Sequence, residues 1–136
     1  MHIYLDSNVF ISALNIEFGR QVRPLFLEAQ QFFERIAQEK HTLVLSGLFF
    51  NEIKRSAFQE KEFILGYFSK LGIVVEELAV PPKVSLQDFH SKGMHFPDSL
   101  HAFLALHSGC SCLVTFNRKD FIAVEAFIPV LEPTQL

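Results

Sequence analysis

The stretch that decides the fold is Ile3-Tyr4-Leu5-Asp6-Ser7-Asn8-Val9-Phe10. Its first three residues form a short apolar run that ends at a carboxylate, which is typical of a buried strand. Ser7 or Asn8 can then cap a helix whose apolar face begins with Val9 and Phe10. The chain therefore opens with a strand that leads directly into a helix.

The same alternation of strand and helix continues along the chain. Further strands are predicted at 42–45, 73–75, 112–115 and 128–131, the last at an edge of the sheet, where its proline is tolerated. Helices are predicted at about 24–40, from a cap at Ser46, at 59–70, at 85–90, and at 97–109. The alternation indicates an α/β fold with three α/β/α layers and a mainly parallel central sheet of four to five strands.

Composition narrows the class of protein. A chain of 136 residues with 49% hydrophobic residues suits one globular domain, 1–136, and excludes a disordered protein. Cys110 and Cys112 are too few for a disulfide or zinc framework, and no stretch is a signal peptide or a membrane span, so we expect a cytoplasmic protein. A net charge of −3 argues against binding nucleic acid by bulk charge alone, but permits a nuclease with a local basic rim. Sixteen Phe residues exceed what a core of this size needs, which predicts an apolar homodimer face.

Aspartate is rare, and three of the four aspartates stand beside the most apolar elements. Asp6 ends the first strand, Asp98 opens the most hydrophobic helix, and Asp120 follows the fourth strand. Residues that follow parallel strands converge on one crevice, where ligands bind in open α/β sheets. Each aspartate has a simpler interpretation as well: a turn for Asp6, a helix-dipole partner for Asp98, and an exposed loop charge for Asp120.

Glu52 is the fourth acid of interest. It shares a helix face with Leu48 and Phe49, so it is predicted to point inward, although an ion pair with Arg55 at i+3 is an equal alternative. A buried cluster of carboxylates needs cations, and oxygen donors suit Mg²⁺ or Mn²⁺ rather than zinc. The six histidines form no metal motif, and His101 is predicted to lie on a helix surface.

Four motifs in this order resemble those of PIN-domain proteins, specifically the VapC-type toxin ribonucleases. They are Tyr4–Phe10 with its Asp-Ser-Asn, Ser46–Glu52, Pro97–Leu106, and Leu113–Phe121 with its Thr-Phe-Asn-Arg-Lys-Asp-Phe. The resemblance covers residues 3 to about 131 and implies a PIN-like domain. One departure matters: Asn117 stands where many relatives have an aspartate two residues after the threonine.

The resemblance implies a Mg²⁺- or Mn²⁺-dependent endoribonuclease, often a homodimer, that is neutralised by a cognate antitoxin. The catalytic, metal-holding acids would be Asp6, Glu52, Asp98 and Asp120. Ser7, Asn8, Thr115 and Asn117 would support them, and either Asn117 or Asp120 would complete the site. Arg55, Arg118 and Lys119 would contact the phosphates of the RNA substrate.

Two other classes compete with this interpretation. One is a catalytically inactive PIN-like module that binds RNA or protein, which the presence of all four acids disfavours. The other is a phosphohydrolase of the haloacid-dehalogenase type, which also begins with an aspartate after the first strand. That family needs a second aspartate two residues further on, where this chain has Asn8.

Overall fold

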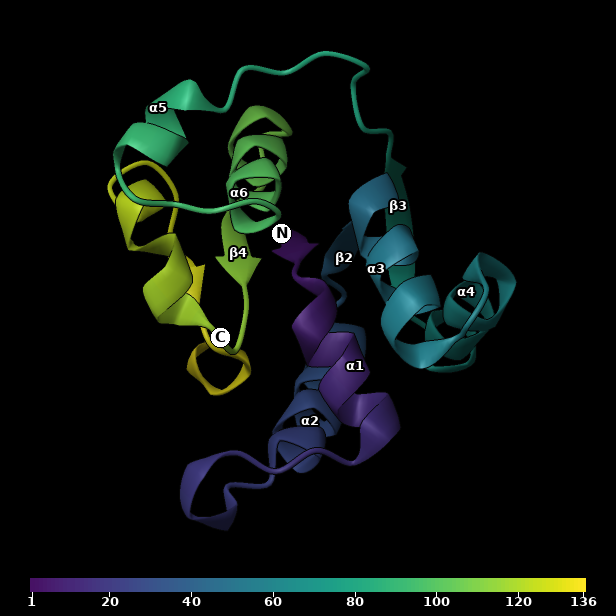
Figure 1. Cartoon of the computed structure of the whole chain (residues 1–136). Coiled ribbons are helices and arrows are strands. Elements are labelled where there is room, and N and C mark those ends of the chain that lie inside the picture. The colour runs from purple at the N-terminus through teal and green to yellow at the C-terminus, as the bar shows by residue number, and fades with distance from the viewer.

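The central sheet carries five parallel strands in the order β3-β2-β1-β4-β5 in the computed structural model, which describes residues 1–136. The strands are β1 (His2–Leu5), β2 (Thr42–Ser46), β3 (Val74–Leu78), β4 (Cys112–Val114) and β5 (Val130–Leu131). The predicted α/β class and parallel sheet are confirmed, and β5 lies at an edge as its proline indicated (Figure 1). The strand that opens the chain, β1, is the central one.

Helices cover the sheet on both faces. They are α1 (Ser7–Asn15), α2 (Leu25–Gln38), α3 (Gly47–Ala57), α4 (Lys61–Lys70), α5 (Gln87–Ser91) and α6 (Asp98–His107), with 3-10 helices at Arg20–Val22, Arg118–Val124 and Pro133–Gln135. Alternation along β1 separates two cores. Ile3 and Leu5 pack with α1, α2 and α4, whereas Tyr4 packs with α5, α6 and the 3-10 helix 118–124. This is the predicted three-layer arrangement. Every helix falls short of the length and hydrophobicity that a membrane span requires.

Aromatic packing fixes α1 on the first core. The Phe10 ring lies 5.1 to 6.3 Å, centroid to centroid, from the rings of Phe33, Phe49, Tyr67 and Phe68. Such edge-on and tilted pairs contribute beyond the area that they bury. The first turn of α1, which directly follows β1, is therefore held against α2, α3 and α4.

Two local predictions need correction. Neither Ser7 nor Asn8 caps α1: Asp6 occupies the N-cap position and its side chain makes no capping bond, because its carboxylate is bonded to Thr115. The third strand runs from Val74 to Leu78 rather than over 73–75, since an edge strand tolerates exposed polar residues. The predicted cap of α3 is confirmed, because Ser46 Oγ accepts from the Phe49 backbone N–H at 3.2 Å.

The strand order creates a switch point between β1 and β4. From β1 the chain continues toward β2 on one side, and from β4 it continues toward β5 on the other, after a long segment has crossed from β3 (Figure 1). In sheets of this kind, ligands bind outside the carboxyl ends of the strands at such a point. Asp6 and Thr115 directly follow these two strands.

Candidate metal centre

Three hydrogen bonds hold Asp6 in place at the end of β1. Its backbone N–H donates to Val114 O at 3.0 Å, and its carbonyl accepts from the Val9 N–H as α1 begins. Thr115 Oγ1 donates to Asp6 Oδ2 at 2.7 Å. The residue is only 5% exposed, so a simple surface turn does not describe it. The interaction joins the ends of β1 and β4 across the switch point.

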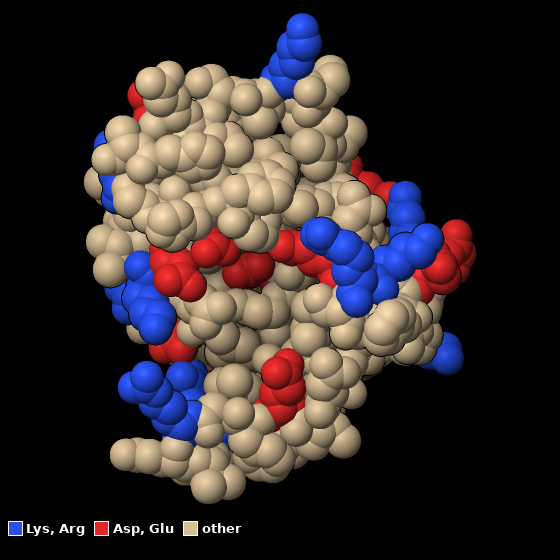
Figure 2. All heavy atoms as spheres, in the orientation of Figure 1, with Lys and Arg blue, Asp and Glu red and all other residues tan.

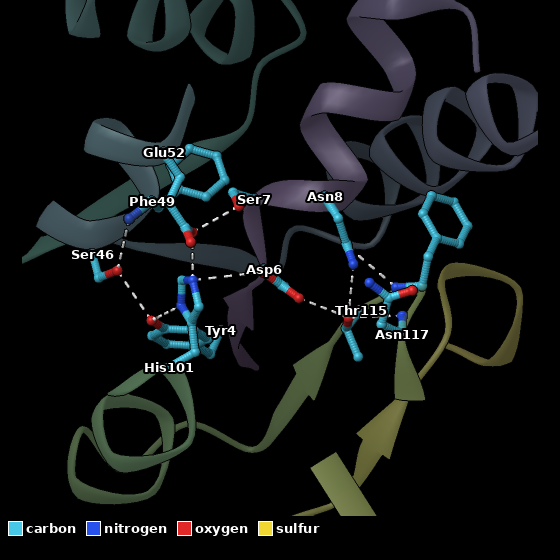
Figure 3. Close-up of polar contacts among 11 residues, drawn as sticks. Tyr4, Asp6, Ser7, Asn8, Ser46, Phe49, Glu52, His101, Thr115 and Asn117 are labelled. Carbon is cyan, nitrogen blue, oxygen red and sulfur yellow. Dashed lines mark hydrogen bonds and ion pairs between the residues drawn. The ribbon is translucent and has the colours of Figure 1, made fainter. Parts of the chain in front are cut away.

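Asn8 and Asn117 hold Thr115 in turn. The Asn8 amide donates to Thr115 Oγ1 at 3.2 Å and accepts from the Phe116 N–H at 3.2 Å, and the Asn117 backbone N–H donates to Thr115 Oγ1 at 3.0 Å. Three of the predicted supporting residues therefore meet around one hydroxyl (Figure 3). Asn117 contributes its backbone, whereas its side chain is exposed and makes no hydrogen bond.

Glu52 points inward from α3, as one of its two interpretations predicted. Its Oε1 accepts from Ser7 Oγ at 2.8 Å and lies 2.6 Å from His101 Nε2. Arg55 is exposed one turn further along and forms no ion pair with Glu52, so that alternative is wrong. The Glu52 side chain points inward because it lies on the apolar face of α3. The same face buries Leu48 and Phe49, which belong to the two different cores.

His101 was predicted to lie on a helix surface, and that prediction is wrong. The side chain is fully buried, with Nε2 3.6 Å from Asp6 Oδ1 and 2.6 Å from Glu52 Oε1. On the other side of the ring, Nδ1 lies 2.6 Å from the Tyr4 hydroxyl, which donates to Ser46 Oγ at 3.0 Å (Figure 3). The available signal was its i+3 spacing from Asp98 in a helix that is apolar on nearly every side.

The charges of this cluster shift one another's titration. Burial raises the pKa of Asp6, and the Glu52 charge adds to it, although His101 and Thr115 act in the opposite direction. Burial also acts to raise the pKa of Glu52, but the hydrogen bonds and charge of His101, with Ser7, lower it overall. Burial opposes the charged form of His101, yet the bond to Glu52 and the charges of Asp6 and Glu52 raise its pKa. The buried imidazole is thus a counter-ion of the two acids.

Asp98 and Asp120 lie together in an adjoining pocket. The pocket has a volume of about 420 Å³ and is lined by both aspartates together with Lys92, His95 and Lys119. Asp98 is half-buried, and burial, followed by the charges of Asp6 and Asp120, raises its pKa to about 6. Asp120 is exposed, as its simpler interpretation held, but it shares this pocket with Asp98, which Asn117 does not line.

Basic side chains border the acids. Lys119 also lines a neighbouring pocket of about 430 Å³ with Arg20, Arg23 and Arg118. Arg118 Nε donates to Glu125 at 2.9 Å, so part of its charge is already paired. Figure 2 shows a row of carboxylates in a hollow across the face of the molecule, with Lys and Arg side chains at both ends. Lys92, Arg20 and Arg23 were not identified from the sequence, because all three lie outside the four acidic motifs.

The inner cluster has the donor atoms that a divalent cation needs. One ligand atom from each of Asp6, Glu52 and His101 lies within 4.8 Å of the other two. Cation–ligand distances of about 2.0–2.2 Å place ligand atoms on one ion about 3–4 Å apart, so small side-chain adjustments suffice. Ser7 and Thr115 already orient the two carboxylates, as partners outside the first shell of a metal commonly do.

The chain matches no protein-family model and no curated protein sequence.

Proposed function

We propose that the protein is a metal-dependent endoribonuclease that hydrolyses RNA phosphodiester bonds. The observation that carries the proposal is that Asp6 and Glu52, from separate segments, meet at the carboxyl edge of the sheet, while Asp98 and Asp120 line the adjoining pocket. Asp98 and Asp120 share their pocket with Lys92 and Lys119, and Figure 2 shows acidic side chains in a hollow with basic side chains at its ends. Acids that bind a cation, set within a rim that attracts phosphates, are the arrangement that cutting a nucleic-acid backbone requires.

Under this proposal, the residues of the centre have different roles according to where they lie. Asp6 and Glu52 would hold Mg²⁺ or Mn²⁺, which when bound activates water and stabilises the charge that develops on the phosphate. Ser7 and Thr115 keep the two carboxylates oriented. Asp98 presents a third carboxylate next to them, and Lys119 lies where it can neutralise a phosphate of the substrate.

A role as the toxin of a toxin–antitoxin pair, acting as a homodimer in the cytoplasm, belongs to the same proposal. The four motifs support it, as do large apolar side chains on the surface: Phe58 is 86% exposed, Phe96 62% and Phe127 60%. Apolar surface of this kind marks sites of protein contact. Sedimentation analysis tests the dimer, and growth arrest on expression, relieved by the product of a neighbouring short reading frame, tests the toxin role.

A second function is favoured by one specific observation. His101 lies against both inner acids and neutralises them without any cation. A PIN-like domain that has lost catalysis and binds RNA or protein would have a centre closed in this way. The two proposals differ in whether the acids are needed for metal-dependent cleavage.

The decisive experiment is cleavage of a structured RNA with Mg²⁺, with Mn²⁺ and with EDTA. Asp6→Asn keeps the size and one acceptor of the side chain, and is expected to lower cleavage by about 100-fold or more, because several kcal/mol of transition-state stabilisation depend on the metal. Asp88→Asn is the matched control, since Asp88 is exposed on α5 and outside both acidic groups. Equal cleavage by wild type and Asp6→Asn would refute the metal-dependent ribonuclease, and no cleavage with any metal would favour the binding module instead.

A further inference from the structure

One nitrogen of His101 faces the acids and the other does not. Nε2 points between Asp6 Oδ1 and Glu52 Oε1, whereas Nδ1 lies against the Tyr4 hydroxyl (Figure 3). The ring is fully buried and its edge is packed on Tyr4, with the ring centroids 5.6 Å apart at 74°. Its direction is therefore set by the fold rather than by a flexible side chain.

The hydrogen-bond chain behind the ring assigns its protons. Tyr4 donates its hydroxyl proton to Ser46 Oγ, which also accepts from the Phe49 backbone N–H. The Tyr4 oxygen thus has only a lone pair to offer His101, so Nδ1 carries a hydrogen. In the metal-free protein Nε2 carries a second proton, which it donates to Glu52 Oε1 at 2.6 Å. When a cation displaces that proton, Nδ1 keeps its own hydrogen and the Nε2 lone pair is directed at the acids, which is the arrangement of a histidine that ligates a metal.

The imidazole changes the donor set that the carboxylates alone would offer. Two carboxylates and water suit Mg²⁺ and Mn²⁺ equally, but Mg²⁺ binds nitrogen poorly and keeps an octahedral shell of oxygens. Because the packing of the His101 ring fixes the direction of Nε2, the site favours Mn²⁺, Co²⁺ or Zn²⁺ over Mg²⁺. His95, which lines the outer pocket, is exposed and stands outside this group of three.

We propose that His101 Nε2 is a metal ligand together with Asp6 and Glu52, and that it makes the centre selective for transition-metal ions over Mg²⁺. The inference deepens the proposed function, and it depends only on the metal-binding part of that function. It makes His101 a direct metal ligand, which a site formed by the two carboxylates alone would not require.

Calorimetric titration of the full chain with Mn²⁺ and with Mg²⁺ tests the selectivity. Wild type is expected to bind Mn²⁺ about tenfold or more tightly than Mg²⁺, and His101→Gln to lose most of that difference, since loss of even an outer partner costs a metal site about 10–100-fold. His107→Gln is the control, because His107 lies exposed on the same helix and is stacked on Phe103. A ratio that His101→Gln leaves unchanged overturns the proposal.

A spectroscopic measurement on wild type covers the case in which His101→Gln does not fold. With Co²⁺ bound, the Nδ1 proton of a ligating imidazole gives a strongly shifted proton resonance that exchanges with D₂O. We expect one such resonance for His101, and its absence from Co²⁺-saturated protein overturns the assignment. RNA cleavage separates the two proposals: ligation without cleavage refutes only the ribonuclease, and cleavage without a His101 resonance or effect refutes only the ligand role.

Discussion

The two pairs of acids at the edge of the sheet are treated in opposite ways. Asp6 is buried and Glu52 is partly buried, and their carboxylates receive hydroxyl donors and an imidazole, whereas the carboxylates of the partly buried Asp98 and the exposed Asp120 form no hydrogen bond or ion pair. Within the inner pair burial raises the pKa of Asp6 while His101 lowers that of Glu52, and in the outer pair burial and the neighbouring charges raise the pKa of Asp98 to about 6. The inner pair carries its own counter-ion, and the outer pair depends on one from outside.

Removing His101, the counter-ion of Asp6 and Glu52, should have the largest effect on the free energy of unfolding. His101→Leu leaves Asp6 and Glu52 buried against each other, and breaking a buried ion pair on one side costs about 3–5 kcal/mol of unfolding free energy. Urea unfolding in EDTA measures it, with His107→Leu as the exposed control on the same helix. A loss below about 1 kcal/mol would mean that the imidazole is not the counter-ion of the pair.

Removing the Thr115 hydroxyl, which orients Asp6, should have the second-largest effect on the free energy of unfolding. Thr115→Val has nearly the same shape, but removes the donor to Asp6 Oδ2 and the acceptor of two amide N–H groups. Hydrogen bonds to charged groups contribute about 1.5–3 kcal/mol, so we expect a loss of that size in urea unfolding. The same variant should weaken Mn²⁺ binding. A variant as stable as wild type would show that water replaces the hydroxyl.

In the outer pair, Asp98 and Asp120, removing a charge should raise the free energy of unfolding, and the size of that gain should depend on pH. The folded pKa of Asp98, about 6, lies above its ordinary value of 3.8, so the ionised carboxylate costs stability above pH 6 and the cost disappears as the pH falls toward 3.8. Asp98→Asn should therefore stabilise the metal-free protein by about 1 kcal/mol at pH 8, after allowance for solvent screening, and by only a small part of that at pH 4. Urea unfolding at both pH values checks this, with Asp88→Asn as control. Stabilisation that is equal at pH 4 and pH 8 would refute the electrostatic cause.

The smallest effect distinguishes Asn117 from Asp120. Asn117→Ala keeps the backbone N–H that bonds to Thr115, so stability should stay within about 0.5 kcal/mol and Mn²⁺ affinity should not change. Asp120→Asn removes a charge beside Asp98 and should weaken Mn²⁺ binding by a few-fold, measured by the same titration. The reverse ranking would assign completion of the site to Asn117.

Much of this arrangement follows from local sequence. The alternation of apolar runs and capped helices predicted a mainly parallel sheet of four to five strands, and the sheet has five, all parallel. The sequence also singled out Asp6 and Glu52. His101 was not predicted, because an amphipathic pattern reveals a polar residue only by contrast with an apolar face. The α6 helix buries residues on several sides, so a buried histidine and an exposed one give the same sequence pattern. Tyr4 was predicted to be buried in a strand, but its bond to His101 joins residues 97 positions apart.

The spacing of the centre along the chain has a consequence for its biosynthesis. Asp6 bonds to a residue 109 positions later, and Glu52 bonds to residues 45 positions before it and 49 after it. No N-terminal fragment that stops short of α6 and β4 contains a complete set of donors. Under the proposed metal role, a ribosome must translate most of the message before the nascent polypeptide contains every donor of this centre, and a truncated translation product would lack some of them.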